Sequence, residues 1–162
     1  MNKLIIICVS MLSLMFISCE GTKTAEEYFT SAEVERNAKN IKASLESLDN
    51  LINNYPEHSL APQAQYLMGD IYMNDLRDFD NAISSYSKVV ENYSDSSHEA
   101  QAQFMVGYVQ ANILSDFDQA RSTYKIFLEK FPDHELAPSV QFEIDNLGRN
   151  INDIPVLKHI AS

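Results

Sequence analysis

Apolar and small side chains recur at steps of three and four along most of this chain, the spacing of one face of an α-helix. Two such series are Tyr66, Gly69, Tyr72 and Met73, and Ala82, Ile83, Tyr86, Val89, Val90 and Tyr93. No stretch shows the period-two alternation of a half-buried strand. The pattern predicts helices over 25–38, 40–54, 60–75, 78–92, 98–113, 116–130 and 136–147.

The helical pattern repeats with a period of about 38 residues. The stretch Gln63–Gly69 returns as Gln101–Gly107, and Asp78-Phe79-Asp80 returns as Asp116-Phe117-Asp118. Self-similarity at a period of roughly 20–50 residues marks a repeat architecture. The sequence therefore predicts an all-α stack of antiparallel helix pairs, with about three full units and part of a fourth.

Residue types that begin and end helices support these boundaries. Side chains able to cap a first turn precede each second helix, at Asn40, Asp78 and Asp116. Gln119 follows Asp116 by three residues, as in a capping box. Prolines mark the turns between units, with Pro56 and Pro132 after a helix and Pro62 and Pro138 inside the first turn of the next. Gly148 is the expected C-cap of the last helix.

The first residues have the layout of a secretory signal. A positive start ending in Lys3 precedes an apolar run over 4–16, which is shorter than the roughly 20 residues of a membrane-spanning helix. Ile17-Ser18-Cys19 follows and resembles the bacterial lipoprotein signal. The resemblance implies removal of residues 1–18 and attachment of acyl chains such as palmitate to Cys19. The alternative is that Cys19 is an ordinary residue beside a cleavage site.

Residues 19–24 then form the lipidated cysteine and a short polar tether. About five extended residues reach at most roughly 15–18 Å, so the folded part is expected close to the bilayer. Cys8 lies in the discarded apolar run and needs no function.

The charge balance limits the class of partner. The formal net charge is -11 at pH 7 and the apolar content is 45%, as in a folded soluble domain. Nucleic acids and anionic lipid surfaces attract clustered Lys and Arg, so neither is expected as a direct partner. A basic protein surface is compatible with this charge.

The chain shows no pattern of a catalytic, metal or cofactor site. The histidines His58 and His134 occupy equivalent turns between units, where polar side chains are normal. No His or Cys pair has the spacing of a zinc site, and no glycine-rich phosphate loop is present. We therefore expect a protein that is not an enzyme, with no metal, no cofactor and no small-molecule substrate.

The repeat residues are similar to the tetratricopeptide repeat. They are Gly69-x-x-Tyr72 on the first helix, Ala82 and Tyr86 on the second, and a proline after it. Gln65 and Gln103 replace the usual Trp. The resemblance implies a right-handed superhelix with about three repeats plus a C-terminal capping helix. It spans 25–150, leaving 151–162 as a tail or truncated capping helix.

The longer period and the Asp-Phe-Asp motif resemble two periplasmic families, the outer-membrane assembly lipoproteins of the BamD type and the YbgF repeat domain. They imply a lipid-anchored, non-enzymatic adaptor that binds other envelope proteins or peptides, at the outer membrane facing the periplasm. The alternatives are a Tol-Pal and cell-division scaffold, or a small structural subunit that forms oligomers. In the last case the apolar tail residues Ile154, Val156, Leu157 and Ile160 pack on a partner or a second copy.

The inner surface of such a superhelix is lined by the first helices of the units. Counting from Gly69 and Gly107, the candidates for partner binding are Tyr66, Asp70, Met73, Asn74, Phe104, Tyr108 and Asn112. Tyr66 and Phe104 alternatively fill space between helices. Asn74 and Asn112 recur at one position and either contact a peptide or cap a loop.

Overall fold

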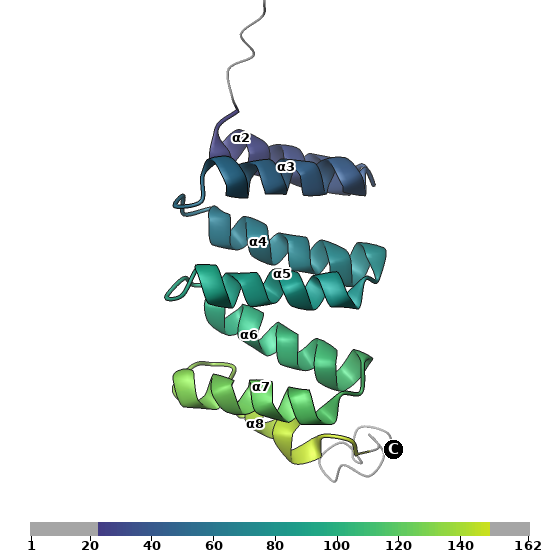
Figure 1. Cartoon of the computed structure of the whole chain (residues 1–162), viewed down its shortest axis with the longest axis vertical. Helices are drawn as coiled ribbons and strands as arrows, with labels where there is room; N and C mark the ends of the chain where they lie inside the picture. Colours follow the sequence, from purple (N-terminus) through teal and green to yellow (C-terminus); the bar gives the residue numbers. More distant parts are fainter. Residues whose placement is uncertain (1–22, 150–162) are drawn as a thin grey trace, which may run out of the picture.

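The computed structural model describes residues 23–149, which form seven α-helices and no strand. The helices are α2 (Ala25–Asn37), α3 (Ile41–Asn54), α4 (Ala61–Asp70), α5 (Phe79–Asn92), α6 (Glu99–Tyr108), α7 (Phe117–Lys130) and α8 (Ala137–Asn146). Figure 1 shows them stacked in sequence order, from α2 at one end to α8 at the other. The prediction of an all-α stack of antiparallel helix pairs is confirmed for this part of the chain.

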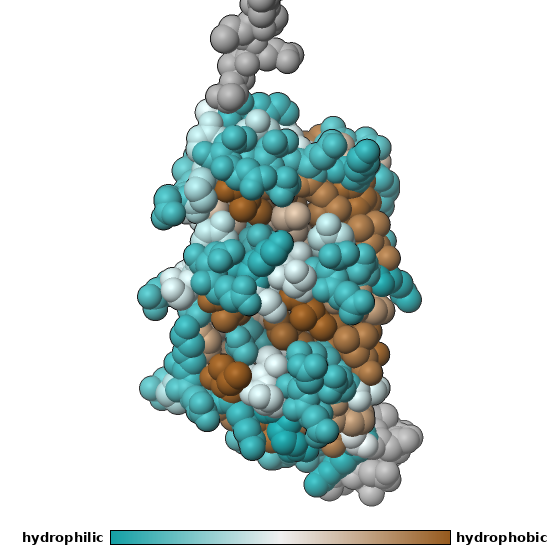
Figure 2. Space-filling view, viewed as in Figure 1, coloured by the Kyte–Doolittle hydropathy of each residue, from teal (hydrophilic) through white to brown (hydrophobic). Residues whose placement is uncertain are grey.

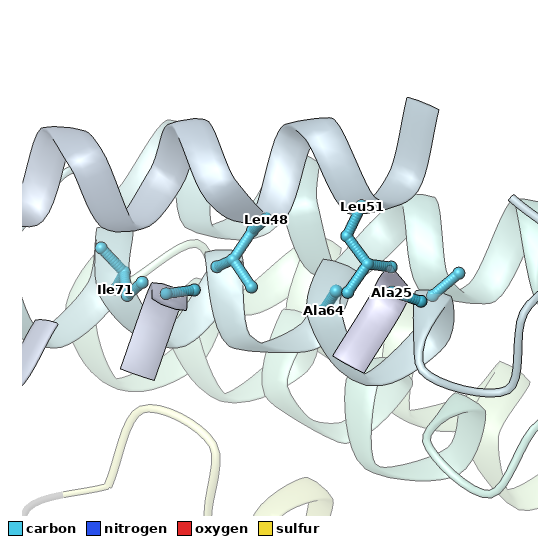
Figure 3. Close-up of a cluster of buried hydrophobic side chains, with 7 residues drawn as sticks. Ala25, Leu48, Leu51, Ala64 and Ile71 are labelled. Carbon is cyan, nitrogen blue, oxygen red and sulfur yellow. The ribbon is translucent and has the colours of Figure 1, made fainter. Parts of the chain in front are cut away.

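The buried core runs along the stack in three clusters. In the first, Leu48 and Leu51 point from the same side of α3, and Leu51 lies beside Ala64 of α4, as Figure 3 shows. The main contacts join helices that are consecutive in the sequence, α2 to α3 through α7 to α8. Each unit is therefore stabilised by its immediate neighbours, as in other repeat proteins.

A glycine on the first helix and a tyrosine on the second define the contact inside a pair. A Cβ atom added at Gly69 would lie 2.6 Å from Cδ1 of Tyr86, and one added at Gly107 would lie 2.6 Å from Cδ1 of Tyr124. Both rings are fully buried. In the first pair the equivalent positions are Ser31 and Leu48, so the tight contact belongs to the second and third pairs.

The first helices of the second and third pairs end in π-helical turns, which the sequence pattern did not predict. These are η2 (Ile71–Leu76) and η3 (Val109–Ile113). Left-handed residues follow at the same repeat position, with φ of 65° at Lys39, 54° at Arg77 and 56° at Ser115. None of the three is glycine, so each is strained relative to a helical residue. These widened ends accommodate part of the extra length of the 38-residue period.

The predicted caps are present on two of the three second helices. Asp78 Oδ1 accepts from the backbone N–H of Asn81 at 3.2 Å, and Asp116 Oδ1 accepts from that of Gln119 at 3.1 Å. The expectation for Asn40 is wrong, because its side chain donates to Glu35 instead. A complete capping box occurs at the start of α2, where Thr24 and Glu27 bond to each other's backbone N–H.

The turns between units are held in two ways. His58 Nδ1 accepts from the backbone N–H of Leu60 at 3.2 Å, and His134 Nδ1 accepts from that of Leu136 at 3.1 Å. The middle turn has no such histidine. There the buried carboxylate of Glu99 pairs with Lys130 and accepts from the backbone N–H of Asp95. The histidines of the turns are structural, as their position predicts.

The surface seen in Figure 2 is largely hydrophilic, with separate apolar patches. The large apolar side chains that are exposed are Val34, Leu76, Ile113, Leu114, Phe117, Ile126 and Phe142. No helix of the described residues is long and apolar enough to cross a membrane. The predicted signal peptide, Cys19 and the tail over 151–162 lie outside the described residues.

We expect Gly107→Ala to lower the free energy of unfolding by up to about 2 kcal/mol. The new methyl group overlaps the Tyr124 ring, and overpacking costs about 1–3 kcal/mol, more than the roughly 1 kcal/mol gained in helix propensity. Urea denaturation measures the change. In a Tyr124→Leu background the same substitution should cost much less, since Ser31 and Leu48 show that a side chain fits against leucine. An equal cost in both backgrounds would contradict the contact.

Candidate functional site

The first helices and their π-helical ends bear all the predicted partner-binding residues. We call the surface formed by α2, α4, α6, α8, η2 and η3 the inner face. Two side-chain contacts join neighbouring helices across it. Arg36 Nε donates to Asp75 Oδ2 at 2.7 Å, between α2 and η2. Asn112 Nδ2 lies 3.4 Å from Glu143 Oε2, between η3 and α8.

In the second pair, most predicted residues contact one buried tyrosine. The Tyr86 hydroxyl donates to Asp70 Oδ1 at 2.6 Å and lies 3.8 Å from Met73 Sδ. The Tyr66 ring lies 5.2 Å from the Tyr86 ring and 5.8 Å from the His98 ring, measured between centroids. Tyr66 therefore fills space between helices, as its alternative interpretation predicts, and Asp70 already accepts a hydrogen bond from the protein.

The polar side chains of η2, at the end of the first helix of this pair, also bond within the protein. Asn74 is exposed, and its Nδ2 donates to the carbonyl of Asp70 one turn earlier at 3.0 Å. Asp75 pairs with Arg36 and lies 4.0 Å from Lys39 Nζ. Asp70, Asn74 and Asp75 are thus satisfied within the protein, whereas the buried Nε2 of Gln65 on α4 has no partner.

The third pair differs at the matching positions. Tyr108 replaces Asp70, so the Tyr124 hydroxyl loses the acceptor that Tyr86 has. The Tyr124 hydroxyl is buried and has no hydrogen-bond partner. Burial, followed by the nearby carboxylate of Glu143, raises its pKa. This half of the inner face therefore contains an unsatisfied donor next to a carboxylate.

The remaining predicted residues of the third pair lie beside this hydroxyl or on the surface above it. The Phe104 ring lies 6.1 Å from the Tyr124 ring and 6.2 Å from the Tyr108 ring. Asn112 is exposed, and its contact to Glu143 is long for a hydrogen bond. Phe104 is thus a packing residue, whereas Asn112 is accessible. A role of either in partner binding stays a prediction.

Sequence reasoning missed the residues that distinguish the two halves. The sequence pattern names Tyr86 only as a repeat-motif residue of the second helix and gives no role to its hydroxyl, which donates to Asp70 on the first helix. Glu143 aligns with Leu67 and Met105 in the repeat, so the pattern gives no sign of a carboxylate at this position. The sequence did contain a usable signal. Asp70 of the second unit aligns with Tyr108 of the third, so the Tyr124 hydroxyl cannot have the carboxylate acceptor that Tyr86 has.

The described part of the chain shows no arrangement for metal chemistry. Within residues 23–149, no group of three or more His, Cys, Asp or Glu side chains is placed to hold a metal ion. The inner face offers hydrogen-bonding groups, aromatic rings and carboxylates. These groups suit recognition of another molecule.

Comparison with known proteins agrees with the repeat period. The family model described as tetratricopeptide repeat matches residues 63–96 and 101–134. These ranges cover most of α4 with α5, and most of α6 with α7. The first pair and α8 lie outside them, and both lack the glycine–tyrosine contact. No curated protein matches the sequence. Repeats of this type generally mediate binding to other proteins or peptides and typically form scaffolds without enzymatic activity.

We expect the buried tyrosines to destabilise the fold at high pH. Burial, then the Asp70 carboxylate, raises the pKa of Tyr66 to about 12. Burial, then the hydrogen bond to Asp70, raises the pKa of Tyr86 as well. The folded chain holds these protons more tightly than the unfolded chain, whose tyrosines have a pKa of about 10. Stability is therefore intact below about pH 10 and falls as the pH rises further.

Phenolate absorbance and circular dichroism, recorded in one alkaline titration, measure this effect. The late phase of phenolate formation should coincide with loss of helical signal. Tyr66→Phe keeps the ring and removes one titrating group, so it should weaken the fall in stability. Ionisation of every tyrosine in one step near the ordinary pKa, with the helices intact, would contradict the burial of these groups.

Proposed function

We propose that this protein, which is of the tetratricopeptide-repeat type, is an adaptor held at the bacterial cell envelope by acyl groups on Cys19. In this proposal it catalyses no reaction. It binds a segment of another envelope protein on the inner face, at the half formed by α6, η3 and α8.

The observation that favours this half is the contrast between Tyr86 and Tyr124. Tyr86 donates to Asp70 at 2.6 Å, whereas the buried Tyr124 hydroxyl has no partner. A buried, unpaired hydroxyl costs roughly 1–3 kcal/mol. Because the hydroxyl is fully buried, a bound segment reaches it only when neighbouring side chains move, and an acceptor brought there would remove that cost. In the second unit the Tyr86 hydroxyl has its acceptor, and the unpaired buried donor there is the Gln65 amide; the third unit differs in having its unpaired hydroxyl near the Glu143 carboxylate.

Electrostatics favours a segment that contains Lys or Arg. The chain has a net charge of -11, and Glu143 lies within hydrogen-bonding range only of the amide of Asn112 among the described side chains. Asp75, by contrast, is paired with Arg36. Complementary charge mainly affects the rate and specificity of association. A basic segment would then approach the α8 half of the inner face preferentially.

The anchor is supported by the sequence and by the start of the fold. The capping box of Thr24 and Glu27 starts the first helix at Ala25, with five residues between it and Cys19. Because two or more acyl chains give stable attachment, lipidated Cys19 would hold α2 close to the bilayer. A role in outer-membrane protein assembly follows from the BamD-like resemblance. The YbgF-like scaffold and the oligomeric subunit are the competing roles.

Site-specific photocrosslinking in native envelopes tests the binding surface. A crosslinking residue at Asn112 should capture one discrete protein, one at Asn74 should capture less of it, and one at exposed Ser122 of α7 should capture none. Glu143→Lys should abolish capture from position 112, because it places a cation where the proposal expects one from the partner. Equal capture from Asn112 and Ser122 would rule out the inner face as the binding surface.

Cys19→Ala tests the anchor. We expect the variant to leave the membrane pellet and appear in the soluble fraction, because it lacks the thiol that carries the acyl group. Cys8→Ala is the matched control and should stay in the pellet, since Cys8 lies in the part that is removed. Immunoblots of both fractions measure the distribution. Persistence of Cys19→Ala in a salt-washed pellet would refute lipid anchoring.

A further inference from the structure

One first helix in the described part of the chain has no second helix to cover it. In the second and third pairs, the aromatic side chain of the first helix packs against the tyrosine of the second, Tyr66 on Tyr86 and Phe104 on Tyr124. Phe142 of α8 occupies the same repeat position and is 39% exposed. The α8 face is therefore an apolar surface whose counterparts in the stack are covered.

The residue that ends α8 has a backbone conformation that lets the following chain turn back toward this face. Gly148 has φ of +75°, the left-handed conformation that ends helices. It shares this conformation with Arg77 and Ser115, after which the chain reverses and runs back along the first helix, although Gly148 stands five residues earlier in the repeat. Residues 150–162 continue from this point. They are close in length to a second helix such as α7, so the stretch can reach Phe142.

The sequence after Arg149 has the pattern of a short amphipathic helix. Asp153 is a residue type that caps helices, and Pro155 would stand in the first turn, as Pro62 does in α4. Ile154, Leu157 and Ile160 are spaced by three residues. At about 100° per residue they fall within one third of a helix circumference. His159 falls on the opposite side.

In the fourth unit, both residues of the glycine–tyrosine contact are replaced. Asp145 occupies the position of Gly69 and Gly107, and Ser162 occupies the position of Tyr86 and Tyr124. A ring could not approach α8 past the Asp145 side chain, and the segment brings no ring there. Smaller aliphatic side chains need no such close approach, which fits the composition of residues 153–162.

We propose that residues 153–162 of the same chain dock on α8 as a short second helix that covers Phe142. Ile154, Leu157 and Ile160 form the contact. The docked segment completes the fourth pair and covers the end of the stack. The inner face then ends at Glu143, and the surface beyond Phe142 is not available to a partner.

The absence of tryptophan from the chain allows a direct test. Phe142→Trp in the full-length protein, purified in detergent, provides a single fluorophore on the α8 face. We expect blue-shifted emission and weak quenching by acrylamide. Adding Leu157→Asp should shift the emission to the red and strengthen quenching, whereas adding His159→Asp, on the opposite side of the segment, should change neither.

Two outcomes of the fluorescence experiment would overturn the proposal. Emission that is already red-shifted in Phe142→Trp and unchanged by Leu157→Asp would show that nothing covers this face. A blue shift that disappears on dilution, together with a dimer in light scattering, would show that a second copy covers it. Hydrogen exchange of α8 in the chain with native Phe142 is an independent measurement. Leu157→Asp should lower the protection of α8, and unchanged protection would contradict docking.

Discussion

The contact between a glycine of one helix and a tyrosine ring of the next determines how the middle of this stack is built. At Gly69 and Gly107 there is no space for even a methyl group beside the rings of Tyr86 and Tyr124. The close approach buries both rings completely. It also places each hydroxyl beside the inner-face residues of the first helix. One packing contact therefore fixes both the spacing of the pair and the hydrogen-bonding groups that its inner face presents.

Repetition made most of the fold predictable from a single sequence. Each helix was supported by its own apolar spacing and by its copies 38 residues away, so the predicted ranges differ from the observed ones by only a few residues at each end. The π-helical ends were not predictable in this way. They lie at the turn between the two helices of a pair, and the left-handed residues there, Lys39, Arg77 and Ser115, have no common side-chain signal. Asn40 is a residue type that caps helices, yet its side chain donates to Glu35 and makes no cap hydrogen bond.

The sequence predicted where the candidate residues lie, but it did not predict what each of them contacts. Helical register alone placed Asp70, Met73 and Asn74 along the first helix of the second unit. The role of each residue depends on side chains from other elements. Tyr86 donates a hydrogen bond to Asp70, and Arg36 donates one to Asp75. The same limit applies to Glu99, which stands where the other units have Ala61 and Ala137. Its partner Lys130 is distant in the sequence, and a repeat alignment does not reveal such a pair.

A stack stabilised by neighbouring contacts lets one unit change without altering the others. Replacing the Asp70 position by Tyr108 leaves the Tyr124 hydroxyl unpaired, a local cost of about 1–3 kcal/mol that the adjacent helices can offset. The second unit keeps its hydrogen bonds, and the third unit keeps the same backbone geometry with different polar groups. Under the proposed function, divergence of this kind leaves a hydroxyl whose hydrogen bonding changes when a segment binds. In the proposed binding mode, a partner would gain most in the third unit, where this unpaired hydroxyl lies near the Glu143 carboxylate.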